Sequence, residues 1–137
     1  MWIGAVLANF GAFLDRTGRH VQAEALYQRS LITLERAVGP NHVNIAAILN
    51  DLAECYRLQR RYAEAEPLYL RAIAIAEAAL SNDDPRLGMY RRSYAKLLRG
   101  TRRKAEARHF EKLASRPRGQ ETMNTLTVDV LDLHRGK

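Results

Sequence analysis

The stretch AEAEPLYLRAIAIAEAAL, residues 63–80, decides the fold because a closely similar stretch precedes it. QAEALYQRSLITLERAV, at residues 22–38, has the same order of small, acidic and aromatic residues, so that Tyr27 corresponds to Tyr69 at a spacing of 42. A period of this size is typical of proteins built from repeated helical hairpins. The sequence therefore predicts a repeat protein.

Three units follow one another at this spacing, at about 2–42, 43–84 and 85–118. In the second unit, apolar residues recur at steps of three and four, which is the pattern of an amphipathic helix, and each unit reads as helix, tight turn and helix. A short polar turn divides each unit, and a short turn makes the paired helices antiparallel neighbours. We therefore expect an all-α protein. Its domain at 1–118 is predicted to be an α-solenoid of about three helix-turn-helix units, followed at 119–137 by an irregular tail that is extended or flexible.

Pro67 lies one turn inside the helix that is predicted to begin near Tyr62. An interior proline costs about 3 kcal/mol, whereas burial of a large apolar side chain returns about 1.5 to 3 kcal/mol. With several such side chains following it, the helix is expected to continue through the proline. Other signals limit the helices: Gly39 suits a helix end, and Asp84 followed by Pro85 suits a helix start.

The pattern of large and small residues in the second unit resembles the tetratricopeptide repeat. The 42-residue spacing and the AEPLY stretch are similar to the long form of this repeat found in kinesin light chains. HEAT and armadillo repeats have a similar period but lack this pattern of small residues. The resemblance covers about residues 4–115. It is weakest in the third unit, where Arg91 and Glu111 replace large apolar residues. The residues that carry it are Leu49, Leu52, Ala53, Tyr56, Ala65, Tyr69 and Ala72.

The resemblance implies a right-handed stack of helix pairs whose first helices line a concave groove that holds a peptide. It also implies an interaction scaffold without catalytic residues, in which asparagine side chains hold the ligand's backbone. On helical spacing, the polar residues predicted to face the groove are Asn9, Asn50, Asp51, Glu54, Arg57, Arg92, Lys96 and Arg99.

The positive charge of the chain is concentrated near its C-terminus. Residues 1–85 carry a net −2, whereas residues 86–137 carry a net +9. Cations at Arg92, Lys96 and Arg99 recur at steps of four and three and so align on one side of a helix, which favours a protein or peptide partner that is acidic. A second interpretation is that these cations form only the solvated outer face of a terminal repeat.

The basic third unit and the apolar N-terminal helix suggest two other classes of partner. Nucleic acid would suit the charge of the basic third unit. However, Tyr94, His109 and Phe110 are predicted on its packing face, where they could not stack on bases, and no nucleic-acid motif occurs. The sequence therefore argues against a nucleic-acid partner. The apolar N-terminal helix, with Val6 and Phe10, has no preceding helix to cover it. An assembly module that forms a homodimer through this helix or through the tail therefore remains an alternative.

The sequence predicts no enzyme, cofactor or metal site. The four histidines are scattered, with no pair at metal spacing on one helix, and no catalytic motif occurs. His42 is predicted to be a linker residue near a helix start. Cys55, the single cysteine, is predicted to be a core residue, which fits a cytoplasmic protein. The apolar opening segment lacks a basic leader and is too short to span a bilayer, so no membrane association is expected.

Overall fold

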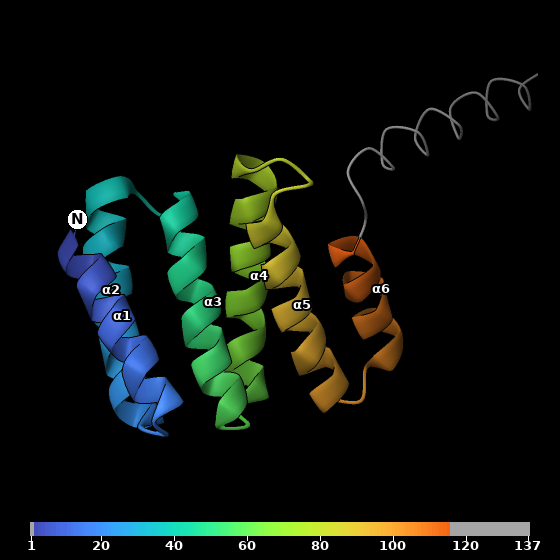
Figure 1. The fold of residues 1–137 in the computed structure, drawn as a ribbon, viewed down its shortest axis with the longest axis horizontal. Coiled ribbons are helices and arrows are strands. Elements are labelled where there is room, and N and C mark those ends of the chain that lie inside the picture. Colours follow the sequence, from blue (N-terminus) through green and yellow to red (C-terminus); the bar gives the residue numbers. More distant parts are fainter. Residues whose placement is uncertain (1, 116–137) are drawn as a thin grey trace, which may run out of the picture.

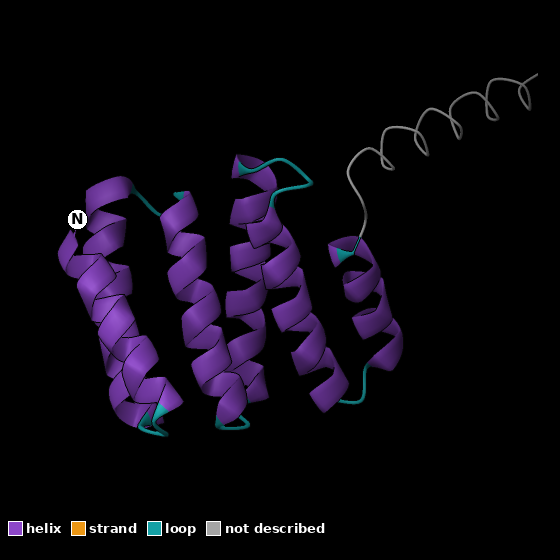
Figure 2. Cartoon of the chain, in the orientation of Figure 1, coloured by secondary structure: helices purple, strands orange, loops and turns teal. Residues whose placement is uncertain are grey.

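The structure is a computed structural model that describes residues 2–115, and every regular element in this range is a helix (Figure 2). The expected all-α class is therefore confirmed. The expected tail at 119–137 and the end of the third unit at 118 lie outside the described residues. In chain order the helices are α1 (Trp2–Arg16), α2 (His20–Val38), α3 (Val43–Leu58), α4 (Tyr62–Ala79), α5 (Pro85–Gly100) and α6 (Lys104–Ala114).

The six helices form three antiparallel hairpins that follow one another in chain order along the long axis of the molecule (Figure 1). Helix α2 packs on α3 and α4 packs on α5, so that each hairpin covers the next. The backbones of the first helices also approach one another closely, α1 with α3 and α3 with α5, whereas α2, α4 and α6 meet one another only through long side chains. The predicted solenoid is confirmed, and the first helices lie on its inner side. We call the side formed by α1, α3 and α5 the inner surface.

Small residues lie where the helices of each hairpin meet. Ala23, Ala53, Ala65 and Ala107 have no solvent exposure, and Gly11 is also buried. A methyl group on the Gly11 α-carbon would lie only 3.0 Å from a ring atom of Tyr27. The small side chains therefore allow the close helix approach that the sequence predicted. Large apolar and aromatic side chains fill the space between them, among them the fully buried Tyr27, Tyr69, Tyr90, Leu49 and Leu97.

The helix limits follow the capping signals of the sequence. Asp84 is the N-cap of α5 and accepts a hydrogen bond from the Arg86 backbone N–H at 2.9 Å, while Pro85 is the first helical residue. Gly39 ends α2 in the left-handed region, at φ 86°. His42, predicted near a helix start, is the N-cap of α3, and its Nδ1 accepts a hydrogen bond from the Asn44 backbone N–H at 3.1 Å.

Pro67 lies inside α4, as expected, and the helix continues through it. Tyr69 has no exposure and Ile73 is buried, so the far side of the helix is held in the core. Pro67 itself is exposed, and so is Ala63, whose carbonyl loses its helical donor. Water can reach that carbonyl, which limits the cost of the missing bond.

One position in each hairpin turn has a left-handed backbone. Gly18 has φ 81°, Arg60 has φ 60° and Arg102 has φ 64°. These positions are 42 residues apart, so the three turns share one conformation. Only the first turn uses glycine there, although the left-handed region is unfavourable for residues with a β-carbon.

Candidate functional site

All eight predicted groove residues lie on the first helices, which contact one another along the inner surface. Their exposure differs. Asn9, Arg92, Lys96 and Arg99 are exposed, Asp51, Glu54 and Arg57 are half-buried, and Asn50 is buried.

Asn50 has the most unusual environment of these residues. Its side chain is 5% exposed, and its Oδ1 atom has no hydrogen-bond partner within the part of the chain that the structure describes. Glu54 and Arg57 follow at steps of four and three on the same helix, so the three residues share one side of α3. Buried polar atoms nearly always have partners, and leaving one without a partner costs about 1 to 3 kcal/mol. The Asn50 oxygen is thus an unpartnered acceptor that is itself closed to solvent.

Glu54 and Arg57 form a partnered ion pair on the inner surface. The Arg57 guanidinium donates two hydrogen bonds to the carboxylate, at 2.8 and 3.2 Å, and the Tyr69 hydroxyl from α4 donates a third. The bond to Glu54 is the main cause that raises the pKa of Arg57 above its usual range. Burial, followed by the charge of Glu54, raises the pKa of the Tyr69 hydroxyl. Arg57 therefore already has an anionic partner within the chain.

Asp51 is a carboxyl group that resists ionisation. Burial is the main cause that raises its pKa to about 6, and the nearby charges of Glu54 and Asp15 add to the shift. These three acidic residues belong to α1 and α3, so this part of the inner surface is acidic. The basic part lies further along, on α5.

The cations of α5 fall into two groups. The Arg99 side chain donates to both oxygens of Glu111, at 2.5 and 2.7 Å, and is therefore neutralised by α6. Arg92 and Lys96 are exposed and have no carboxylate partner among residues 2–115. These two are the cations of the inner surface that remain available to an anionic ligand.

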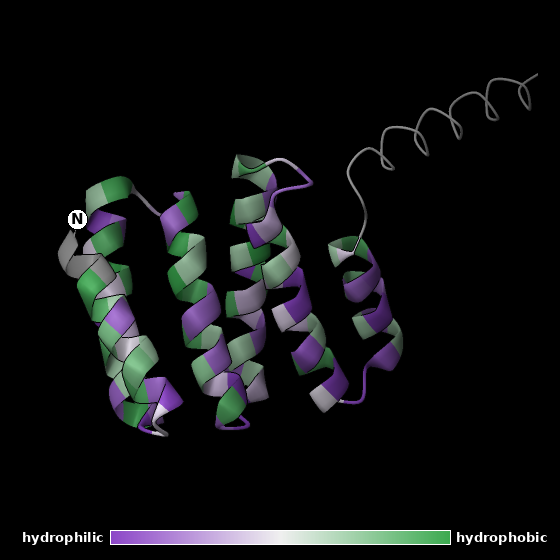
Figure 3. Cartoon of the chain, in the orientation of Figure 1, coloured by the Kyte–Doolittle hydropathy of each residue, from purple (hydrophilic) through white to green (hydrophobic). Residues whose placement is uncertain are grey.

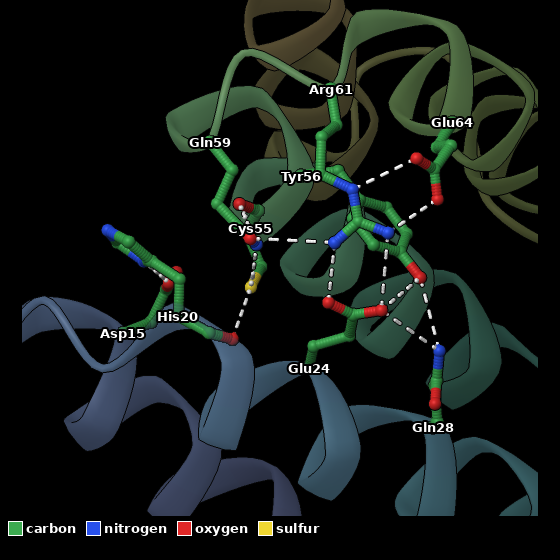
Figure 4. A network of polar contacts seen from close by, with 9 residues as sticks. All are labelled: Asp15, His20, Glu24, Gln28, Cys55, Tyr56, Gln59, Arg61 and Glu64. Atoms are coloured by element: carbon green, nitrogen blue, oxygen red, sulfur yellow. Dashed lines mark hydrogen bonds and ion pairs between the residues drawn. The ribbon is translucent and has the colours of Figure 1, made fainter.

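A second set of polar residues joins the first two hairpins (Figure 4). Arg61, at the start of α4, contacts Glu24 of α2, with Nη1 at 2.7 Å from Oε2. The Tyr56 hydroxyl donates to the same carboxylate at 3.1 Å, and the guanidinium lies over the Tyr56 ring at 4.4 Å. One helix of the first hairpin is thereby linked to both helices of the second. Further along the same junction, Arg71 binds Glu35 at 2.7 Å.

The second junction repeats the Arg61 end of this arrangement and has an arginine from a different helix at the other end. Arg103, which is 42 residues after Arg61, binds Glu66 at 2.7 Å, and the Tyr94 hydroxyl donates to Glu66 at 2.8 Å. At the other end of the junction Arg91 contacts Glu77 at 3.3 Å. In both junctions the second helix of the earlier hairpin supplies two glutamates that are eleven residues apart, and the later hairpin supplies two arginines. We call each of these sets a junction clamp.

The junction clamps were missed by the sequence analysis, although their signal is present. Arg19, Arg61 and Arg103 recur every 42 residues at the start of each second helix. Ion pairs also account for Arg91 and Glu111, which stand where apolar residues were expected: Arg91 belongs to the second clamp, and Glu111 pairs within the third hairpin. Arg91 is 6% exposed and pairs with Glu77, and Glu111 pairs with Arg99.

Three side chains of metal-ligand type meet near the first turn. Asp15, His20 and Cys55 come from three helices, and their ligand atoms lie within 4.8 Å of one another. Spacing along one helix cannot reveal such a group. Asp15 is hydrogen-bonded to the His20 ring, and the Cys55 thiol donates to the His20 carbonyl at 3.3 Å (Figure 4). Burial, with the charge of Asp15, raises the pKa of the Cys55 thiol to about 12, so this sulfur remains a thiol and behaves as the core residue that was predicted.

The aromatic residues of the third hairpin lie mostly in the core. Tyr94 is buried and Phe110 packs against it edge to face, with ring centroids 4.8 Å apart. His109 is exposed, so its predicted place on the packing face is wrong, and its ring contacts only the edge of this cluster through Phe110 at 5.4 Å.

Comparison with known protein families matches residues 2–78 and 44–116 to the tetratricopeptide repeat. The two matched segments span nearly all of the described hairpins. The chain belongs to the tetratricopeptide repeat family. Proteins of this family mediate protein–protein interactions, and the family consists of non-catalytic repeat scaffolds.

Two solved structures extend the comparison. A kinesin light chain-like protein with nearly identical TPR-like repeats, from Podosopora anserina, matches with a TM-score of 0.74 at 16% identity over 80% of this chain and 52% of its own. BtubC (BKLC) from P. vanneervenii matches with a TM-score of 0.75 at 19% identity over 85% of this chain and 48% of its own. This tetratricopeptide repeat chain thus spans about half the length of both and shares their fold. No curated protein matches it.

No helix in the described range is long and apolar enough to cross a membrane.

Proposed function

We propose that this tetratricopeptide repeat protein is a non-catalytic scaffold that binds a peptide segment of a partner protein on its inner surface. The observation that carries the proposal is the pair of exposed cations on α5, Arg92 and Lys96, which have no carboxylate partner among residues 2–115. Acidic side chains of a bound peptide would supply that partner. Asn9, exposed on α1, offers both a donor and an acceptor to the peptide's backbone.

The distribution of charge along the inner surface favours one orientation of the bound peptide. Arg92 and Lys96 favour an acidic segment beside α5, since their charges have no carboxylate partner in the described chain. Asp51 lies on α3, where its charge is already disfavoured, so a second acidic segment would be repelled there. The ligand that fits best therefore has its acidic residues at one end and a neutral or basic segment at the other.

The proposal is tested first by selecting binding peptides from a random display library with the full chain as bait. The variant Asn9→Ala and the combined variant Arg92→Glu with Lys96→Glu should each weaken binding of the selected peptides at least tenfold. A control with equal charge change, Arg102→Glu combined with Lys104→Glu, reverses two exposed cations at the third turn and should leave the affinity unchanged. Equal losses in both charge variants would show a nonspecific electrostatic effect, and no loss in either inner-surface variant would refute the site.

Salt dependence separates the peptide proposal from nucleic-acid binding. Binding to nucleic acid driven by the basic third hairpin would weaken steeply with salt for any sequence. Peptides that also bond to the Asn9 amide should keep their rank order of affinity across a salt series.

Cys55, the single cysteine of the chain, is a free buried thiol, which supports a cytoplasmic location.

A further inference from the structure

An apolar stripe on α1 is exposed where its counterparts in the later repeats are buried. Val6, Phe10 and Phe13 are each about half exposed, at 51, 53 and 51%. Their counterparts 42 residues later are Ile48, Leu52 and Cys55, which are at most 5% exposed, and those after a further 42 are Tyr90, Tyr94 and Leu97, at most 3% exposed. Helix α1 thus carries the same stripe that α3 and α5 bury, and no helix among residues 2–115 covers it. Within the stripe, the rings of Phe10 and Phe13 stack with centroids 6.3 Å apart.

Two arginines of the same hairpin, Arg19 at the N-cap of α2 and Arg29 within α2, have counterparts that form ion pairs. Arg19 corresponds to Arg61 and Arg29 to Arg71, which bind Glu24 and Glu35 in the first junction clamp. Arg19 and Arg29 are exposed, and neither side chain has a carboxylate partner in the range 2–115. The first hairpin therefore presents the arginine half of a junction clamp beside an uncovered apolar stripe.

We propose that this face of the first hairpin, made of Val6, Phe10, Phe13, Arg19 and Arg29, binds an amphipathic helix of another protein that carries two carboxylates eleven residues apart. Eleven residues are about three helical turns, so both carboxylates lie on one side of such a helix. Both clamps within the chain use this spacing, as Glu24 with Glu35 and Glu66 with Glu77. Apolar residues between the carboxylates would cover the phenylalanine rings and remove their surface from water.

Charge argues against a second copy of this chain as the occupant. The glutamate pairs on α2 and α4 are already bound by arginines of their own chain. At the other end of the solenoid, α6 has Arg108 at the position of Glu24 and Glu66. A head-to-tail contact would bring Arg108 towards Arg19, and a face-to-face contact would bring two copies of the arginine pair together. Both arrangements place like charges in contact.

The test uses a stapled helical peptide with the sequence of residues 20–38, because this helix supplies Glu24 and Glu35 to the first clamp. Fluorescence anisotropy with the full chain should show saturable binding. The combined Arg19→Glu and Arg29→Glu variant should weaken it at least tenfold, and so should Glu24→Gln with Glu35→Gln in the peptide. The control variant, Arg36→Glu combined with Arg102→Glu, makes the same charge change at exposed residues elsewhere and should leave the affinity for the peptide unchanged.

Charge exchange makes the test specific. The peptide with Glu24→Lys and Glu35→Lys should lose binding to the natural chain and regain it with the combined Arg19→Glu and Arg29→Glu variant. Binding that ignores both substitutions, or no binding by either peptide, would overturn the proposal. Sedimentation provides a further check on the same face: a dimer of the natural chain that Phe10→Ser converts to a monomer would show that a second copy occupies it, and would also overturn the proposal.

Discussion

Arg60 and Arg102 adopt a left-handed backbone conformation that glycine adopts at the same position of the first turn. The conformation costs residues with a β-carbon about 1 to 2 kcal/mol. Part of that cost is offset because glycine has more freedom to lose on folding. At the scale of single residues, the second and third turns therefore store a strain that the first turn lacks.

Replacing Arg60 with glycine should stabilise the protein. We expect a gain of about 0.5 to 1 kcal/mol in the free energy of unfolding, measured by chemical denaturation. The same substitution at Arg36, an exposed position inside α2, should instead lower stability by about 1 kcal/mol, because glycine is unfavourable within a helix. A loss of stability on Arg60→Gly would show that the turn is not strained.

Asp51 makes the stability of the folded protein depend on pH, with a sign opposite to that expected for an ion-paired carboxylate. Its folded pKa of about 6 lies above the usual value of 3.8, so folding favours the protonated form. The folded state binds more protons between these values, and the contribution of Asp51 to stability therefore falls as pH rises from about 4 to 6.

The Asp51→Asn variant tests this expectation. At pH 7.5 it should be more stable than the natural chain by about 1 to 2 kcal/mol, because the cost of burying a charge is removed. At pH 3.5 the two should be nearly equal, because the natural side chain is then mostly protonated. Denaturation curves at both pH values provide the measurement, and an equal difference at both would contradict the raised pKa.

At the scale of the helical hairpin, small residues set the distance between its two helices. Ala65 is fully buried where α4 packs into the hairpin, whereas Ala63, two residues earlier on the same helix, is exposed. The same chemical change at the two positions therefore separates packing from helix propensity.

Ala65→Leu should destabilise the chain by about 1 to 3 kcal/mol, since the added carbon atoms have no space in the core. Ala63→Leu should change stability by less than about 0.5 kcal/mol, because the new side chain points to solvent. Thermal and chemical unfolding of the two variants supply the comparison. Similar stabilities would mean that the hairpin spacing can relax, and that small residues are not required there.

At the scale of the whole molecule, the junction clamps fix how the hairpins stack. Each hairpin contacts only its neighbours, so stability depends on the junctions as well as on the hairpins themselves. Arg61 binds two glutamates whose side chains differ in exposure. Glu24, across the junction, is 17% exposed, whereas Glu64, on the same helix as Arg61, is 54% exposed. An interaction that excludes water contributes more than one exposed to it.

Glu24→Gln should therefore lower Tm by about 3 to 6 °C, because it weakens contacts of both Arg61 and Tyr56 across the junction. Glu64→Gln, the matched change on the exposed side of the same arginine, should lower Tm by less than about 2 °C. Calorimetry of the two variants and of their combination provides the test. Equal effects would show that the clamp adds nothing to stacking beyond an ordinary surface ion pair.

The sequence by itself determined the helices, their pairing and the order of the hairpins. These features depend on local periodicity, on capping residues such as Asp84, and on small residues such as Ala65, which act within one helix, one turn or one hairpin. The same reasoning placed the candidate ligand-binding residues on the first helices. It could not tell that Arg99 already has a carboxylate partner on α6, or that the Asn50 oxygen has none.

Only the tertiary structure decided which charges face one another. Arg61 and Glu24 are 37 residues apart, and Asp15, His20 and Cys55 come from three helices. Whether such residues meet depends on how far one hairpin is rotated against the next, and that rotation is set by packing across the whole junction. Spacing along the chain identifies the side of a helix on which a residue lies. The partner on the facing helix is fixed only when the hairpins are stacked.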